Sequence, residues 1–199
     1  MQTSLLPPFL YKRFKSSRLT RKSSSIIGAG PGPGNMILVA LGSNLVSEEF
    51  KTSDLLLEAA LNSLEKREVI ILQRSSWYRS APIPASDQPW FVNGVAKVET
   101  ALAPQALLSV LHEVEAEYGR MRTRRNESRT LDLDLLAYDD QVIEEPGGLV
   151  LPHPRLQDRA FVLLPMAEIA PEWRHPATGV TAAAMLAALP PGQQIERLS

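Results

Sequence analysis

Two aspartates spaced two residues apart, Asp132 and Asp134, are the side chains whose type and spacing could do chemistry. They lie in the segment RTLDLDLL, residues 129–136, where leucines alternate with the aspartates. A period of two is typical of a β-strand with one apolar and one polar face, so both carboxylates would project the same way, roughly 6–7 Å apart. That separation suits Mg²⁺, which takes few protein ligands and completes its shell with water and phosphate oxygens. The alternative is an ordinary half-exposed strand with an acidic outer face.

Cationic side chains on both sides of this strand favour a phosphate-binding site. Five arginines precede it within ten residues: Arg120, Arg122, Arg124, Arg125 and Arg129. Guanidinium groups bind phosphate oxygens through paired donors. Downstream, the Pro-bounded segment LPHPR is followed by Asp158, Arg159 and Phe161, and binding residues are often found on such loops. Cations beside a carboxylate pair indicate a polyphosphate held between them.

Length and composition limit the class of protein. A chain of 199 residues with 44% hydrophobic and 22% charged residues is long enough for one well-buried domain and has ordinary globular composition. No apolar run approaches the roughly 20 residues that cross a bilayer. With no cysteine and three scattered histidines, disulfides and thiolate or zinc-type metal sites are excluded, so any metal would be bound by oxygen.

The net charge of −1 hides an asymmetry. Residues 1–35 contain six Lys or Arg and no acid, so residues 36–199 carry 15 basic against 22 acidic groups, a net −7. A domain of that charge is a poor candidate for nucleic-acid binding, where a basic surface supplies most of the affinity. We therefore expect no nucleic-acid partner and treat the arginine cluster as local.

Residues 1–35 are expected to be a disordered basic N-terminal extension to a domain at 36–199. The segment is rich in Ser and basic residues and ends in a Pro/Gly run that cannot continue a helix or strand. Two interpretations stay open: an over-long reading frame whose working start is Met36, or an organelle-targeting segment. We expect a cytoplasmic protein, with organelle targeting as the alternative.

Apolar periodicity and turn residues predict a β-α-β-β-α-β order followed by further elements. The predicted elements are strands at 37–41, 69–78, 91–98 and at the aspartate segment, helices at 49–66 and from Pro104 to Gly119, a hairpin at 141–151, and helical pieces near 160–169 and 180–189. This order is typical of an α+β, ferredoxin-like antiparallel sheet with two helices on one face. The other face would be open for binding.

Five ordered blocks make the sequence similar to the 6-hydroxymethyl-7,8-dihydropterin pyrophosphokinase family. The blocks are ALGSN at 40–44, SSWYRSAP at 75–82, DQPWFVN at 87–93, GRMRTRRNESRTLDLDLLAY at 119–138 and LPHPRLQDRAFVLLPMAEIAP at 151–171. The resemblance implies a ferredoxin-like enzyme of folate biosynthesis. Such an enzyme transfers the terminal diphosphate of ATP to the hydroxymethyl group of a reduced pterin and releases AMP.

The resemblance also implies roles for individual residues. Asp132 and Asp134 match the ligands of two Mg²⁺ ions and, with Arg120 and Arg129, form the expected catalytic group. The expected pterin-binding residues are Ser80, Pro82, Ile83, Phe91, Asn93 and Phe161, with the two Phe rings enclosing the pterin and Asn93 reading its edge. The expected ATP-binding residues are His112, Glu115, Arg122, His153 and Arg159.

One position departs from the family pattern. Many members carry a Trp in the segment before the aspartates that folds over the site, and this chain has Asn126 there. We expect residues 120–128 to form a mobile lid that closes over ATP mainly through charge.

Two other classes of protein share some of these features. A single-stranded RNA-binding module can have the same β-α-β-β-α-β order and stacks bases on sheet aromatics, but the net charge of −7 and the paired aspartates argue against it. A metal-dependent nucleotidyltransferase would use the aspartates but gives no reason for two aromatics around Asn93. We expect a monomer that binds ATP and the pterin, with no membrane partner.

Overall fold

The computed structural model describes residues 36–45, 49–119 and 130–198, which all belong to one compact unit, Pro31–Ser199. The predicted N-terminal extension at 1–35 and the predicted lid at 120–128 lie outside these ranges, so both stay predictions. None of the helices in the described ranges has the length and apolar character needed to span a bilayer.

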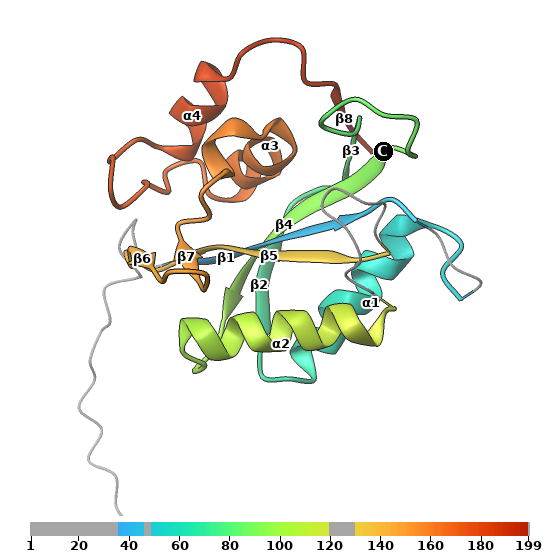
Figure 1. Ribbon diagram of the computed structural model, residues 1–199, viewed down its shortest axis with the longest axis horizontal. Helices are drawn as coiled ribbons and strands as arrows, with labels where there is room; N and C mark the ends of the chain where they lie inside the picture. The colour runs from blue at the N-terminus through green and yellow to red at the C-terminus, as the bar shows by residue number, and fades with distance from the viewer. Residues whose placement is uncertain (1–35, 46–48, 120–129, 199) are drawn as a thin grey trace, which may run out of the picture. The chain divides into compact units, whose positions relative to one another are not determined.

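A six-stranded sheet forms the centre of the fold (Figure 1). Its strands are β1 (Ile37–Ser43), β2 (Ile70–Arg74), β3 (Tyr78–Ser80), β4 (Phe91–Glu99), β5 (Asp132–Tyr138) and β8 (Ile195–Arg197). The order is β5-β1-β4-β3-β8, with β2 pairing to β4 beside β3. Each described pair in this sheet is antiparallel. The mixed helix and antiparallel-sheet class expected from the sequence is therefore confirmed.

The helices and the small hairpin lie close to their predicted positions. They are α1 (Ser53–Glu65), α2 (Pro104–Glu117), the short 3-10 helix η1 (Leu156–Asp158), α3 (Ala160–Ile169), α4 (Ala182–Ala188), and the hairpin of β6 (Ile143–Glu144) with β7 (Val150–Leu151). Pro104 occupies the first turn of α2, where its missing N–H costs nothing. Gly119 follows α2 at φ 78°, a conformation that glycine adopts without strain and that ends many helices.

Helices α1 and α2 lie on one face of the sheet, as predicted, but α3 and α4 cover the other face, which corrects the prediction that this face is open. One core joins Val39 and Leu41 of β1 to α1 and α2, and a second joins Leu38 of β1 to α3 and α4. Successive strand residues point to opposite faces, so the two cores lie on opposite sides (Figure 1). The run ILVAL at 37–41 is apolar at every position, as in strands that are buried on both faces.

The predicted strand at 69–78 is interrupted, which corrects a single long strand to two short ones, β2 and β3. Between them the backbone N–H of Ser75 donates to the carbonyl of Val95 at 2.9 Å, and the Ser75 hydroxyl accepts the Val95 N–H at 3.0 Å. The Trp77 ring lies against Gly94 of β4, where an added Cβ would come within 2.5 Å of the ring. Trp77 therefore packs against the sheet.

Candidate active site

The paired aspartates lie on the sheet face that carries α3 and α4, close to two other strands. Leu133 and Leu135 of β5 are buried towards α1 and α2, so Asp132 and Asp134 face the opposite side, where they are partly exposed. The predicted alternation of an apolar and an acidic face in this segment is therefore confirmed. It brings two carboxylates to the surface of an otherwise buried strand.

Gly42 of β1 lies between Asp132 and Asn93. It is the register partner of Asn93 on β4 and of Asp132 on β5, and directly opposed residues share a face. A Cβ added to Gly42 would be 3.2 Å from Asn93 Oδ1 and 3.9 Å from Asp132 Cβ. The absence of a side chain there leaves Asn93 and Asp132 next to each other across β1. No role in the site was predicted for Gly42, although the block ALGSN contains it.

Arg159 and His153 approach the second aspartate. Asp134 Oδ2 lies 3.7 Å from Arg159 Nη1 and 4.0 Å from His153 Nε2. The side chain of Asp134 is 36% exposed, whereas those of Arg159 and His153 are 18% and 14% exposed. Two residues predicted from the downstream segment at 151–171 thus lie beside a carboxylate predicted from the aspartate strand.

The orientation of His153 is set by two backbone contacts. Its own N–H donates to the carbonyl of Leu136 on β5 at 2.8 Å, and its ring Nδ1 accepts the N–H of Arg155 at 3.2 Å. Because Nδ1 is an acceptor, the proton of the neutral ring is on Nε2, the atom nearer Asp134. Burial is the largest cause of a lowered His153 pKa, the Asp134 carboxylate opposes it, and the Arg159 guanidinium adds to it. His153 is therefore mainly neutral at pH 7.

A buried polar pair lies on the neighbouring part of the sheet. Asn93 Nδ2 donates to Ser80 Oγ at 2.9 Å, and both side chains are buried. Since the Nδ2 group has this partner, Oδ1 is the atom that lies beside Gly42. Ser80 is also the register partner of Phe91, so three predicted pterin-binding residues are grouped on β3 and β4.

The other predicted pterin-binding residues differ in their exposure. Pro82 is buried, Phe91 and Phe161 are half-buried, and Ile83 is 54% exposed. The guanidinium carbon of Arg159 lies 5.3 Å from the centre of the Phe161 ring. Arg159 therefore touches both the Phe161 ring and the Asp134 carboxylate, which connects the predicted pterin region to the aspartates.

Asn44 was not singled out from the sequence and links two of its blocks. Its Nδ2 donates to the carbonyl of Pro89 at 3.2 Å and lies 3.4 Å from Gln88 Oε1. The turn after β1 is thus bound to the segment that leads into β4. The signal was present, because Asn44 ends the block ALGSN and the other two residues lie in the block DQPWFVN.

The predicted ATP-binding residues of α2 have different environments. His112 is exposed, whereas Glu115 is only 2% exposed and its Oε1 accepts the backbone N–H of Leu133 at 2.7 Å. Leu133 lies between the two aspartates, so the described contact of Glu115 is with the aspartate strand. The structure does not describe Arg120, Arg122, Asn126 or Arg129. Their roles therefore stay predictions.

The sequence of the chain is similar to that of a known family. The sequence model of the 7,8-dihydro-6-hydroxymethylpterin-pyrophosphokinase family matches residues 38–171. The chain is 44% identical over 163 residues to a 2-amino-4-hydroxy-6-hydroxymethyldihydropteridine pyrophosphokinase of Pseudomonas aeruginosa, covering 81% of this chain and 96% of the relative. A Haemophilus influenzae protein of the same name is 43% identical over 133 residues, covering 66% of this chain and 79% of the relative.

The chain belongs to the 7,8-dihydro-6-hydroxymethylpterin-pyrophosphokinase family, and this confirms the resemblance drawn from its five blocks. It is therefore an ATP-dependent diphosphotransferase, and its family acts in folate biosynthesis.

Solved structures support the fold. The HPPK-DHPS of Plasmodium falciparum superposes with a TM-score of 0.58 at 15% identity, covering 77% of this chain and 43% of that one. A structure of the same protein carrying the A437G substitution gives a TM-score of 0.61. The chain spans less than half the length of these structures, and at this identity the likeness concerns the fold alone.

Proposed function

We propose that the protein transfers diphosphate from ATP to 6-hydroxymethyl-7,8-dihydropterin and releases AMP. The family and the relative matched over 96% of its length support this substrate pair. The single observation that carries the proposal is the strand register that sets Asn93 and Asp132 on either side of Gly42. An amide suited to a heterocycle edge then lies beside a carboxylate suited to a metal ion, as a reaction between a pterin and a metal-bound polyphosphate requires.

Asp132 and Asp134 are the residues proposed to hold two Mg²⁺ ions. The donors fit this metal, because both are carboxylates on one partly exposed strand face and Mg²⁺ prefers oxygen ligands. Bound Mg²⁺ would neutralise phosphate charge and align the attacking and leaving oxygens for in-line transfer. Diphosphoryl transfer depends mainly on alignment and charge neutralisation, so the proposal needs no covalent nucleophile.

Asn93 is proposed to orient the pterin. Its Nδ2 group is already bonded to Ser80, so Oδ1 is the atom left to accept an N–H from the ring edge. Phe91 and Phe161 would supply the apolar faces, and the backbone of Ser80, Pro82 and Ile83 would meet the opposite edge. Aromatic faces give affinity in such pockets, and a few polar groups give orientation.

His153 and Arg159 are proposed to bind ATP on the aspartate side of this region. Arg159 Nη1 lies 3.7 Å from Asp134 Oδ2, and a guanidinium in that place can bind a phosphate oxygen through paired donors. A neutral His153 with its proton on Nε2 can donate to a phosphate or ribose oxygen. The family resemblance adds His112, Glu115 and Arg122 to this group, and assigns Arg120 and Arg129 to the transferring phosphates.

The strand order also supports a ferredoxin-like topology. Reading β2 and β3 as one interrupted strand, the order β5-β1-β4-β2/β3 is the order of the four strands in a β-α-β-β-α-β unit. Helices α3 and α4 and strand β8 would then be additions to that unit. A monomer in the cytoplasm remains our expectation from the sequence.

A coupled assay tests the proposed function. Purified protein with ATP and Mg²⁺ should form AMP only when 6-hydroxymethyl-7,8-dihydropterin is added, and the pterin should gain two phosphoryl groups by mass. Release of inorganic pyrophosphate with transfer of a nucleotidyl group would instead indicate a nucleotidyltransferase. Binding of single-stranded RNA without any ATP turnover would indicate the RNA-binding alternative.

A further inference from the structure

The C-terminal segment contacts the start of α3 through the side chain of Gln193. Gln193 Oε1 accepts the backbone N–H of Ala160 at 2.8 Å, and Gln193 Nε2 donates to the carbonyl of Asp158 at 2.9 Å. The two bonded residues lie on either side of Arg159 in the sequence, and Phe161 directly follows Ala160. Gln193 lies beyond the stretch that the family model matches, 38–171.

The same segment is also bonded to the loop on the other side of the predicted pterin region. The carbonyl of Gln194 accepts the N–H of Ala81 at 3.1 Å, and in β8 the residue Ile195 is the register partner of Ser80. Two neighbouring glutamines therefore connect the loop that begins at Ser80 with the segment that carries Phe161. One glutamine acts through its side chain and the other through its backbone.

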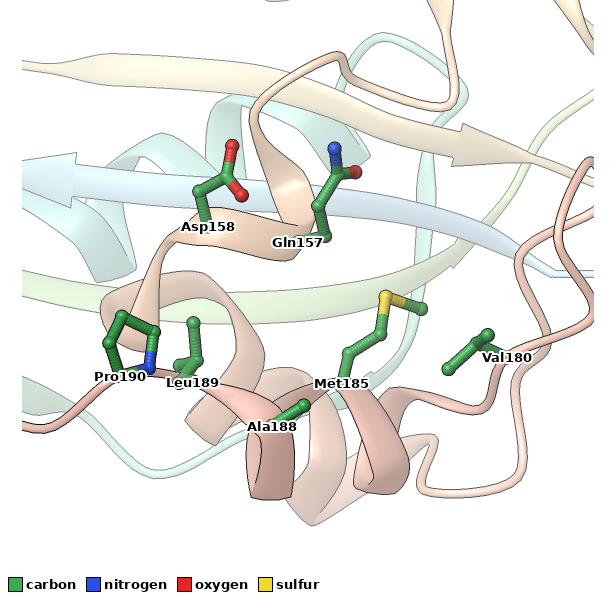
Figure 2. Close-up of a pocket in the computed structure, with 7 residues that line it drawn as sticks. All are labelled: Gln157, Asp158, Val180, Met185, Ala188, Leu189 and Pro190. Atoms are coloured by element: carbon green, nitrogen blue, oxygen red, sulfur yellow. The ribbon is translucent and has the colours of Figure 1, made fainter.

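The contacts of Gln193 satisfy groups that the local structure leaves open. Ala160 is the first residue of α3, and the first N–H groups of a helix have no partner within the helix. On the other side, a cavity of about 320 Å³ separates Gln157 and Asp158 from Met185 and Leu189 of the α4 region (Figure 2). Leu156 of the same turn is fully buried in the core that α3 and α4 share, so the two Gln193 hydrogen bonds add to that packing on the side of the C-terminal segment.

We propose that Gln193 is a positioning residue for the pterin, because it sets the distance between Phe161 and the loop at residues 80–83. The inference rests on the proposed function and extends it to a residue outside the family match. Gln193 acts through Phe161 and does not touch the substrate. ATP has several other proposed contacts near Asp134, whereas the pterin depends on Phe161 for one of its two aromatic faces, so pterin binding should be the more sensitive of the two.

The test compares Gln193→Met with Gln194→Met. Methionine keeps the length of the side chain and removes both hydrogen bonds, and Gln194 is an exposed neighbour whose contact is through its backbone. Pterin dissociation constants are measured by titration calorimetry with a non-hydrolysable ATP analogue and Mg²⁺ at saturation. Loss of the two bonds should weaken pterin binding about tenfold in Gln193→Met, while Gln194→Met should match the wild type.

A conservative variant and an ATP measurement complete the test. Gln193→Glu keeps an acceptor for Ala160 and should weaken pterin binding less than Gln193→Met does, and the affinity for the ATP analogue should change less than twofold in each variant. Normal pterin affinity in Gln193→Met, or an equal loss for pterin and ATP analogue, would overturn the inference. If wild-type protein neither binds nor turns over the pterin, the proposed function itself fails, so the two failures are distinguishable.

Discussion

The carboxylate of Glu115 accepts the backbone N–H of Leu133 at 2.7 Å, between the two aspartates of β5. Among the described strands, β5 is at one end of the sheet and pairs with β1 on its inner side. The Glu115 side chain on α2 thus binds the strand that carries Asp132 and Asp134. It accepts a backbone N–H from this end strand of the sheet. A buried hydrogen bond is electrostatically stronger than one in water, so Glu115 should hold the aspartate strand in place.

We predict that Glu115→Ala destabilises the protein and raises its Mg²⁺ requirement. An unsatisfied Leu133 N–H should cost about 1–3 kcal/mol, and a looser strand should bind the metal less well. Urea denaturation and a Mg²⁺ titration of turnover measure the two effects. Glu113→Ala, an exposed site on the same helix, is the control and should match the wild type. An unchanged free energy of unfolding in Glu115→Ala would contradict the prediction.

Asp134→Ala, and Asp132→Ala to a similar or lesser extent, should lose most turnover while remaining folded. The side chains are partly exposed on the strand face, so the fold does not depend on them, and loss of metal-assisted charge neutralisation should cost several kcal/mol in the transition state. Steady-state kinetics and circular dichroism check this. Asp140→Ala, at the exposed end of the same segment, serves as the control. Near-normal turnover of either variant at ordinary Mg²⁺ would refute the proposed metal site.

Gly42→Ala should weaken pterin binding more than ATP binding. The new Cβ would be 3.2 Å from Asn93 Oδ1, which is tight enough to push the amide from its place beside Ser80. The KM for the pterin should rise several-fold, and the ATP affinity should change little because the contacts proposed for ATP lie around Asp134. If both constants shift by the same factor, Gly42 has a general structural role and does not act through Asn93.

Stability should depend on pH through Glu168 of α3. Its carboxylate accepts the Tyr78 hydroxyl at 2.8 Å and both the N–H and the hydroxyl of Ser76. Burial raises the pKa of Glu168, but these hydrogen bonds and the charge of Arg197 outweigh it, so the pKa lies below its usual value. The stabilisation is therefore fully present above the unfolded-state pKa of about 4.3 and is lost as pH falls through the lower folded-state pKa.

Unfolding measured between pH 6 and pH 2.5 checks this relation. The free energy of unfolding of the wild type should fall over that range, and in Glu168→Gln it should fall less. Glu172→Gln, an exposed residue just after α3, is the matched control and should retain the wild-type dependence. Identical pH profiles for wild type and Glu168→Gln would remove Glu168 as a source of acid sensitivity.

The sequence by itself determined the local elements and the chemistry of the aspartate strand. The alternation of Leu and Asp at 131–135 predicted a strand with two carboxylates on one face, and β5 has that form. Pro104 and Gly119 predicted the ends of α2 within two residues. The five blocks identified the family. These features depend on periods of two or 3.6 residues and on turn residues, which are readable within a short window.

Tertiary structure alone decided which distant residues meet. The register of three strands places Gly42 between Asn93 and Asp132, and Glu115 turns inward to Leu133 although its segment only showed a helical period. The second layer of helices and the bonds of Gln193 likewise join parts of the chain that are far apart in sequence. Strand register and helix placement depend on long-range burial of apolar faces, and a local pattern does not specify its partner.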